Sequence, residues 1–132
     1  MATWLKLIGS ARSPITKWKC DYVGFRKATR PSIRTGDHLL LYAPGVVRRI
    51  FALAQAVTDP EHDPDYDPSK EGSCRWRLSV RYEINLPVAS GIPVGAVSSR
   101  RDLTKSLRQQ SHIRLLPEES ESAKSGLRNP SP

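Results

Sequence analysis

The stretch that decides the fold is "GDHLLLYAPG", residues 36–45 of the 132-residue chain. A Gly-Asp turn precedes the continuous apolar run HLLLYA and a Pro-Gly pair ends it, which is the pattern of a short strand buried on both faces. The next apolar segment, residues 46–58, follows after one tight turn and is β-branched at both ends. It is therefore predicted to pair with the first strand as a hairpin rather than to form a helix.

Working outward, residues 74–88 show the clearest strand pattern. Trp76, Leu78, Val80 and Tyr82 alternate with Arg75, Arg77, Ser79 and Arg81, so one face is apolar and the other polar. Further strands are predicted at residues 3–8, 20–25 and 112–116, and short helices at residues 13–19 and 98–111, the second capped by Ser98 or Ser99. These elements predict an α+β protein, a small twisted β-barrel of about five or six strands with two or three short helices packed around it.

Two segments are predicted to lie outside this barrel. Residues 59–73 are a polar loop with three Asp-Pro steps, expected to be mobile and unable to join a sheet. Residues 1–119 are expected to form the single domain, and residues 120–132 a flexible C-terminal tail.

The net charge of +8 is unevenly distributed. The acidic loop at residues 59–73 has one basic and six acidic side chains, whereas residues 1–58 carry a net +8 and residues 74–116 a net +6. The high positive charge of these two segments predicts a polyanionic partner such as nucleic acid. The alternative is a merely solubilising surface.

The remaining composition narrows the class of protein. No apolar run approaches the ~20 residues of a membrane helix, and the N-terminal residues lack a signal-peptide pattern, so no membrane partner is expected. Cys20 and Cys74 are the only cysteines, which favours a reducing, cytoplasmic location over a disulfide scaffold.

The order of segments resembles the EVE domain, a branch of the PUA-like superfamily related to YTH domains. The similarity covers about residues 3–119: SIRTGDHLLLYAPG, then RIFALAQAVTDP, a polar loop, RWRLSVRYEINLP and LRQQSHIRLLPEE. The resemblance implies a PUA-like barrel that reads a modified base, such as a methylated one, in DNA or RNA. It also implies a nuclease or other effector protein as a second partner.

The stretch KWKCDYVGF, residues 17–25, mixes rings and cations as a base-binding segment would. The resemblance assigns the family's pocket tryptophan to Trp18 and its Arg-Gln-x-Ser segment to the residues ending at Ser111. The family's Gly-Val-Arg-Asn run after the tryptophan is missing, so the identity of the base stays open. The other candidates for the pocket are Tyr42 at the end of its strand, Trp76 and Tyr22. For each ring the alternative is ordinary core packing.

Three basic clusters are candidates for phosphate binding. They are Arg26, Lys27, Arg30 and Arg34; Arg48 and Arg49; and Arg100, Arg101, Lys105 and Arg108.

No catalytic set, metal site or cofactor motif is recognised. The histidines are scattered, the cysteines lack zinc-site spacing, and there is no Gly-rich phosphate loop. An enzyme is therefore not expected. Two alternatives remain open: an ASCH-like hydrolase of a modified nucleoside using Thr16, Lys17 and Glu83, and a protein-interaction domain without a nucleic-acid role.

Overall fold

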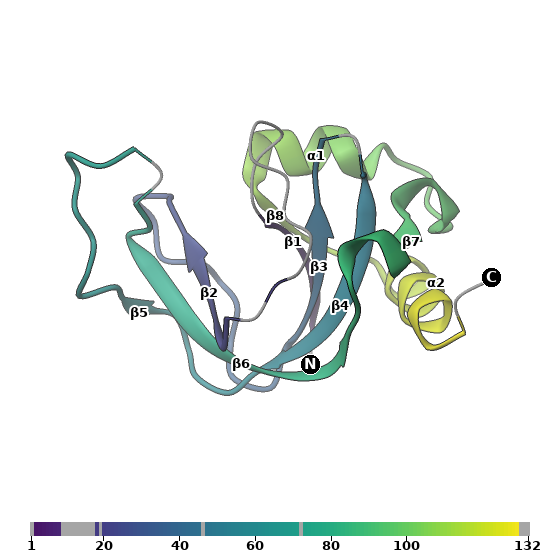
Figure 1. Ribbon diagram of the computed structural model, residues 1–132, viewed down its shortest axis with the longest axis horizontal. Coiled ribbons are helices and arrows are strands. Elements are labelled where there is room, and N and C mark those ends of the chain that lie inside the picture. The colour runs from purple at the N-terminus through teal and green to yellow at the C-terminus, as the bar shows by residue number, and fades with distance from the viewer. Residues whose placement is uncertain (1, 9–17, 19, 46, 72, 130–132) are drawn as a thin grey trace.

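The computed structural model describes residues 2–8, 18, 20–45, 47–71 and 73–129 (Figure 1). One mixed sheet runs through the molecule in the strand order β2-β6-β4-β3-β1-β8, with β5 paired to β6 and β7 to β4. The strands are β1 Thr3–Leu7, β2 Tyr22–Phe25, β3 His38–Ala43, β4 Arg49–Ala56, β5 Glu61–His62, β6 Trp76–Asn85, β7 Ile92–Pro93 and β8 His112–Arg114. The helices are α1 Leu103–Gln110 and α2 Pro117–Arg128, with 3-10 turns at Val88–Ser90 and Val94–Ala96.

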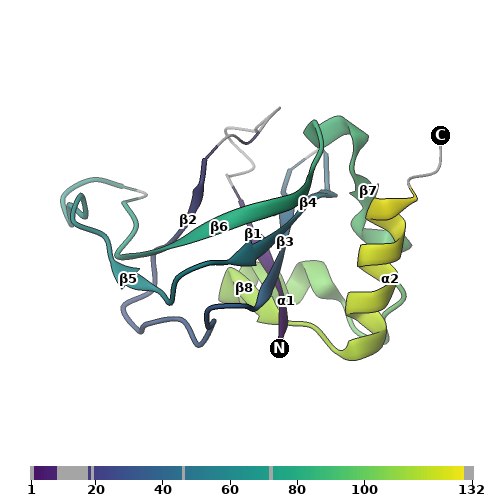
Figure 2. The same ribbon diagram turned by 90° about the horizontal axis from the view of Figure 1, so that it is seen from below.

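The sheet curls into a half-barrel, as Figures 1 and 2 show. β1 lies parallel to β3 and antiparallel to β8, and every other pairing is antiparallel. The register shifts at Leu41/Tyr42 and at Leu53/Ala54, and irregularities of this kind increase local twist. The small α+β barrel predicted from the sequence is confirmed, including the β3–β4 hairpin and the apolar face of β6.

Both faces of β3 are buried, which explains its uninterrupted apolar run. Leu39 and Leu41 point into the curl, where they join an inner core that includes Phe25 and Phe51. Leu40 and Tyr42 belong to an outer core that α1 and α2 cover through Leu103, Leu107, Ala123 and Leu127.

The prediction of a flexible tail at residues 120–132 is wrong, because most of this segment belongs to the helix α2. Pro117 occupies the first turn, and the Glu119 carboxylate accepts a hydrogen bond from the Leu116 N–H at 2.8 Å. Ala123 and Leu127 are buried against the sheet. The sequence signal for this helix is weak, because it consists of two apolar residues one turn apart among serines and glutamates.

Two further expectations need correction. The α1 cap is Asp102, whose carboxylate accepts from the Lys105 N–H at 3.1 Å, rather than Ser98 or Ser99. The acidic loop does join the sheet, since Glu61 and His62 pair with Arg77 and Trp76 of β6. The Asp-Pro steps flank this two-residue strand, so they limit its length without preventing it. The helix expected at residues 13–19 lies outside the described residues, apart from Trp18.

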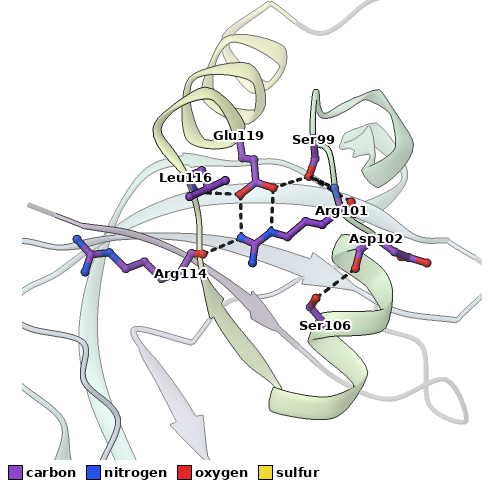
Figure 3. Close-up of polar contacts among 7 residues, drawn as sticks. All are labelled: Ser99, Arg101, Asp102, Ser106, Arg114, Leu116 and Glu119. Carbon is purple, nitrogen blue, oxygen red and sulfur yellow. Dashed lines mark hydrogen bonds and ion pairs between the residues drawn. The ribbon is translucent and has the colours of Figure 1, made fainter.

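Arg101 and Glu119 form a buried ion pair that fixes α2 to the segment before α1 (Figure 3). The guanidinium donates to both carboxylate oxygens at 3.0 and 2.8 Å, and to the Arg114 carbonyl at 2.8 Å. The Ser99 hydroxyl donates to the same carboxylate. Burial alone would raise the pKa of Glu119, but the hydrogen bonds from Arg101, Ser99 and Leu116 outweigh it and lower the pKa to about 2.

Replacing Arg101 with Met should lower the free energy of unfolding by about 2–4 kcal/mol at neutral pH, because it leaves the Glu119 carboxylate buried without its cation. This range is lower than the usual cost of removing one partner of a buried ion pair, because the Arg101 side chain is 38% exposed. In the wild-type protein, the interactions of the Glu119 carboxylate stabilise the fold above its ordinary pKa of 4.5, and this stabilisation is lost as the pH falls toward 2. The free energy of unfolding of the variant should therefore decrease less steeply over this pH range.

Urea unfolding at pH 7 and between pH 2 and 5 measures both effects. Arg100→Met, at the exposed neighbouring position, is the matched control and should be near neutral. Equal stabilities of the two variants would contradict the assigned role of the pair.

Candidate functional site

The two ends of the sheet, β2 and β8, meet across a seam that side chains fill. The Phe25 ring of β2 packs edge-on against the His112 ring of β8, with ring centroids 5.1 Å apart. His112 in turn lies 5.7 Å from the Trp4 ring of β1. A cavity of about 350 Å³ opens at this seam, between β1 and β2. Its lining residues are Lys6, Leu7, Ile8, Trp18, Gly24, Arg26, Lys27, Cys74 and Ser111.

Lys6 is the least expected of these residues, because it is only 6% exposed. Its ammonium lies 4.9 Å from the centroid of the Phe25 ring. Burial, together with the charges of Arg26 and Lys27, lowers the pKa of Lys6 from 10.5 to about 8, although Cys74 acts in the opposite direction. Lys6 is therefore a largely protonated amine held in a poorly solvated place.

The sequence analysis missed Lys6. In TWLKLI its alternation with Leu5 and Leu7 suggests an ordinary solvent-facing lysine. In the structure this face of β1 instead points into the curl, toward Leu41 and Trp4. A single lysine in a strand that pairs on both sides was the available signal.

Ser111 lines the cavity, and His112 follows it in β8, directly opposite Lys6 of β1. Ser111 ends α1 in the left-handed region, with φ 62°, and its N–H donates to the Leu107 carbonyl. This conformation is uncommon for a non-glycine residue, although a left-handed residue commonly ends a helix. The Ser111 hydroxyl lies 3.5 Å from Nδ1 of His112. Burial, and then the charges of Lys6 and Lys27, lower the pKa of His112 to about 4, so its ring is neutral at physiological pH.

Gly24 leaves room for the Cys74 side chain in the opposite wall. A Cβ at position 24 would lie 2.6 Å from the Cys74 Sγ and 2.9 Å from its Cβ. A glycine at this point of β2 therefore lets the cysteine pack directly against the strand.

The structure brings four of the predicted site residues to this cavity: Trp18, Ser111, Arg26 and Lys27. Trp18 is half-buried and packs against the inner core, and its carbonyl accepts from the Asn85 side chain at 2.9 Å. Arg26 and Lys27 are exposed at the end of β2. The short mixed segment of rings and cations thus does contribute both kinds of group to one site.

The other three predicted pocket rings lie elsewhere. Tyr42 is 2% exposed in the outer core, because the alternation of β3 puts it on the same face as Leu40, on the side of the helices. Trp76 packs on the inner core and donates its indole N–H to the Ala28 carbonyl at 3.3 Å. Tyr22 is 46% exposed, with the Arg77 guanidinium 5.7 Å from its ring centroid.

The remaining predicted phosphate contacts are spread over the surface. Arg30 donates to the Pro60 carbonyl at 2.9 Å and Arg49 to the Gly91 carbonyl at 2.7 Å, so both have structural partners. Arg101 already has an anionic partner in Glu119. Arg34, Arg48, Arg100 and Lys105 are exposed, and the Arg108 side chain lies outside what the structure describes.

A larger hollow of about 660 Å³ lies between β8 and α2, lined by residues that include Arg114, Glu121 and Lys124. It is shallower, mixes both signs of charge and carries no aromatic ring. We therefore take the smaller cavity at the seam as the candidate site, since it concentrates a ring, cations and a hydroxyl.

The described residues contain no group of three or more metal-ligating side chains. In the same part of the chain, no helix is both long enough and apolar enough to cross a membrane. Of the residues proposed for a hydrolase, Thr16 and Lys17 lie outside the described residues. Glu83 pairs instead with His38 at 3.3 Å and with Arg128 at 3.9 Å, on the side of α2.

No family model matches the sequence, and no curated protein matches it either. Solved structures do match the fold. Rpa0253 from Rhodopseudomonas palustris is 15% identical with a TM-score of 0.62, and the match covers 99% of this chain and 97% of that one. Human THYN1, solved in complex with 5-methylcytosine-containing DNA, is 16% identical with a TM-score of 0.61 over all of both chains. Atu2648 from Agrobacterium tumefaciens is 18% identical with a TM-score of 0.53, over 100% and 99%. The chain therefore shares the fold of these structures, in agreement with the small α+β barrel predicted from its sequence.

Replacing Lys6 with Met should raise the free energy of unfolding by about 1–3 kcal/mol at pH 7, because folding of the variant no longer removes an ammonium group from water. Methionine has a similar length and no charge. In the wild-type protein the pKa of Lys6 is about 8 when folded, against an ordinary value of 10.5. The destabilising effect of its charge therefore fades as the pH rises from 8 to 10.5, and the stability advantage of the variant should shrink over the same range.

Urea unfolding at pH 7, 9 and 10.5 provides the measurement. The control is Lys70→Met, an exposed lysine in the acidic loop, which should change little at any pH. A destabilised Lys6→Met variant would mean that the charge at position 6 is stabilised by its surroundings, contrary to this account.

Proposed function

We propose that the protein is a non-catalytic nucleic-acid-binding module that holds a modified base in the cavity between β1 and β2. The observation that carries the proposal is the composition of the cavity lining among the described residues: one indole ring, three cations and a hydroxyl, with no carboxylate. A nucleotide needs a flat apolar face for its base, donors for its base edge and cations for its phosphates, and the cavity provides all three.

The base would stack on Trp18. This indole lines the cavity together with Ile8, and both side chains lie at the inner core, so a base would meet apolar surface there. A methyl group on the base would add buried apolar area against the same surface. The volume of about 350 Å³ falls in the range of small-ligand sites.

The phosphates on either side of the base would contact Arg26 and Lys27. Both side chains are exposed and line the cavity, so they can reach a backbone that passes over its opening. Their charges act on Lys6 as well, which places them within electrostatic reach of a bound nucleotide. The exposed Arg34, Arg48, Arg100 and Lys105 would add a weaker, non-specific attraction.

The likeness to THYN1 supports this reading, because that protein has the same fold and was solved with DNA containing 5-methylcytosine. A methylated cytosine is therefore the first base to test, in DNA and in RNA. The proposal does not need an effector protein for binding, although a reader of this size would act through a partner.

Binding of a short oligonucleotide with one 5-methylcytosine, measured by fluorescence anisotropy, tests the proposal. Trp18→Ala should weaken this binding by about 1–3 kcal/mol, the usual effect of losing a stacked ring, and should affect the unmodified oligonucleotide much less. The logarithm of the affinity should fall with the logarithm of the salt concentration with a slope of roughly −3 to −6.

The matched control is Tyr66→Ala, which removes a ring from the acidic loop, where Tyr66 contacts Arg75. Thermal melting of each variant separates loss of the site from loss of the fold. Binding that ignores the modification, or that survives Trp18→Ala unchanged in a folded variant, would overturn the proposal.

A further inference from the structure

The charge inside the cavity is not needed to hold a methylated base. Ile8 and Trp18 already provide apolar surface for a methyl group, and the exposed Arg26 and Lys27 provide charge for the phosphates. Lys6 serves neither purpose, because it is buried below the opening rather than beside the path of the backbone.

The surroundings of Lys6 supply little that compensates its charge. The Phe25 ring lies under the ammonium, and Cys74 is the one neighbour that favours the charged form. Arg26 and Lys27 oppose it, and His112 on the adjoining strand is neutral. The part of the cavity lining that the structure describes contains no Asp or Glu. Buried charges are normally paired, as the Glu119 carboxylate is with Arg101 in this same protein.

We propose that the cavity selects an acidic modification, a pyrimidine that carries a carboxylate substituent, and that the Lys6 ammonium binds this carboxylate. The inference rests on the proposed function and specifies its ligand. The Ser111 hydroxyl, in the same wall, would donate a second hydrogen bond to the carboxylate, and Arg26 and Lys27 would add to the positive potential.

A carboxylate in this place has a clear physical advantage over a methyl group. It would complete an ion pair in a poorly solvated site whose cation has already lost its water on folding. Electrostatic attraction is stronger there than at an exposed phosphate, where salt and water screen it. A terminal phosphate of the strand is the other anion that could enter the cavity, so the test includes it.

The experiment compares four oligonucleotides of one sequence at fixed salt: unmodified, with one 5-methylcytosine, with one 5-carboxylcytosine, and unmodified with a 5′-phosphate. Wild-type protein should bind the carboxylated strand about tenfold more tightly than the methylated one. Lys6→Met should reduce this ratio to one or below, whereas Lys6→Arg, which keeps the charge, should retain part of it. Lys70→Met is the control and should retain all of it.

The outcomes separate the two proposals. If the wild-type protein binds the methylated strand as tightly as the carboxylated one, the inference is wrong, while the proposed function stands. If neither modification improves binding over the unmodified strand, the proposed function fails as well. An equal gain from the 5′-phosphate alone would overturn the assignment to a base. If the Lys6→Met variant does not fold, the preference of the wild-type protein and of Lys6→Arg for the carboxylated over the methylated strand still tests the inference.

Discussion

The placement of the candidate site depends on the Asp37 carboxylate at the start of β3. It accepts hydrogen bonds from the Ala2 N–H at 3.1 Å, the Trp4 indole at 3.0 Å and the Arg34 N–H at 3.0 Å. These bonds tie the beginning of β1 to the beginning of β3, in the register that pairs Thr3 with His38 and Lys6 with Leu41. A slip of one residue would turn Lys6 toward the helices and Leu5 into the seam. The partial burial of Asp37 would raise its pKa, but the same hydrogen bonds lower it, so the carboxylate stays charged at neutral pH.

The seam reflects a balance between stability and binding. A barrel closed by backbone hydrogen bonds would leave no opening between β1 and β2, whereas here rings and a lysine occupy the space between the ends of the sheet. Burial of Lys6 disfavours the folded state, and a cavity lined by cations does so further. Such groups are retained where a ligand supplies the missing partner, which is why buried, perturbed side chains in a cavity are candidates for function.

Local patterns predicted most of the sheet, because each strand carries its own signal. The apolar run of β3 and the alternation of β6 correspond to burial on two faces and on one face, respectively. Trp18, Arg26, Lys27 and Ser111 were found because they lie in short recognisable segments that end at the seam.

What the sequence could not predict depends on contacts between distant residues. Lys6 is buried because β2 and β8 approach it, and nothing near it in sequence shows this. Arg101 looks like any surface arginine until Glu119, at the start of a helix that the sequence did not predict, is placed beside it. Tyr42 ends an apolar strand as expected, but an uninterrupted apolar run does not show that its face is the one the helices cover.

The most direct test of the central claim is an NMR titration of the labelled protein with an oligonucleotide that carries one 5-methylcytosine, with the unmodified strand as reference. The account predicts that the shifts specific to the modification gather around the seam, at the amides of Lys6, Gly24 and Ser111 and at the Trp18 indole. Shifts gathered instead at the hollow between β8 and α2, around Thr3, Leu115 and Lys124, would contradict it.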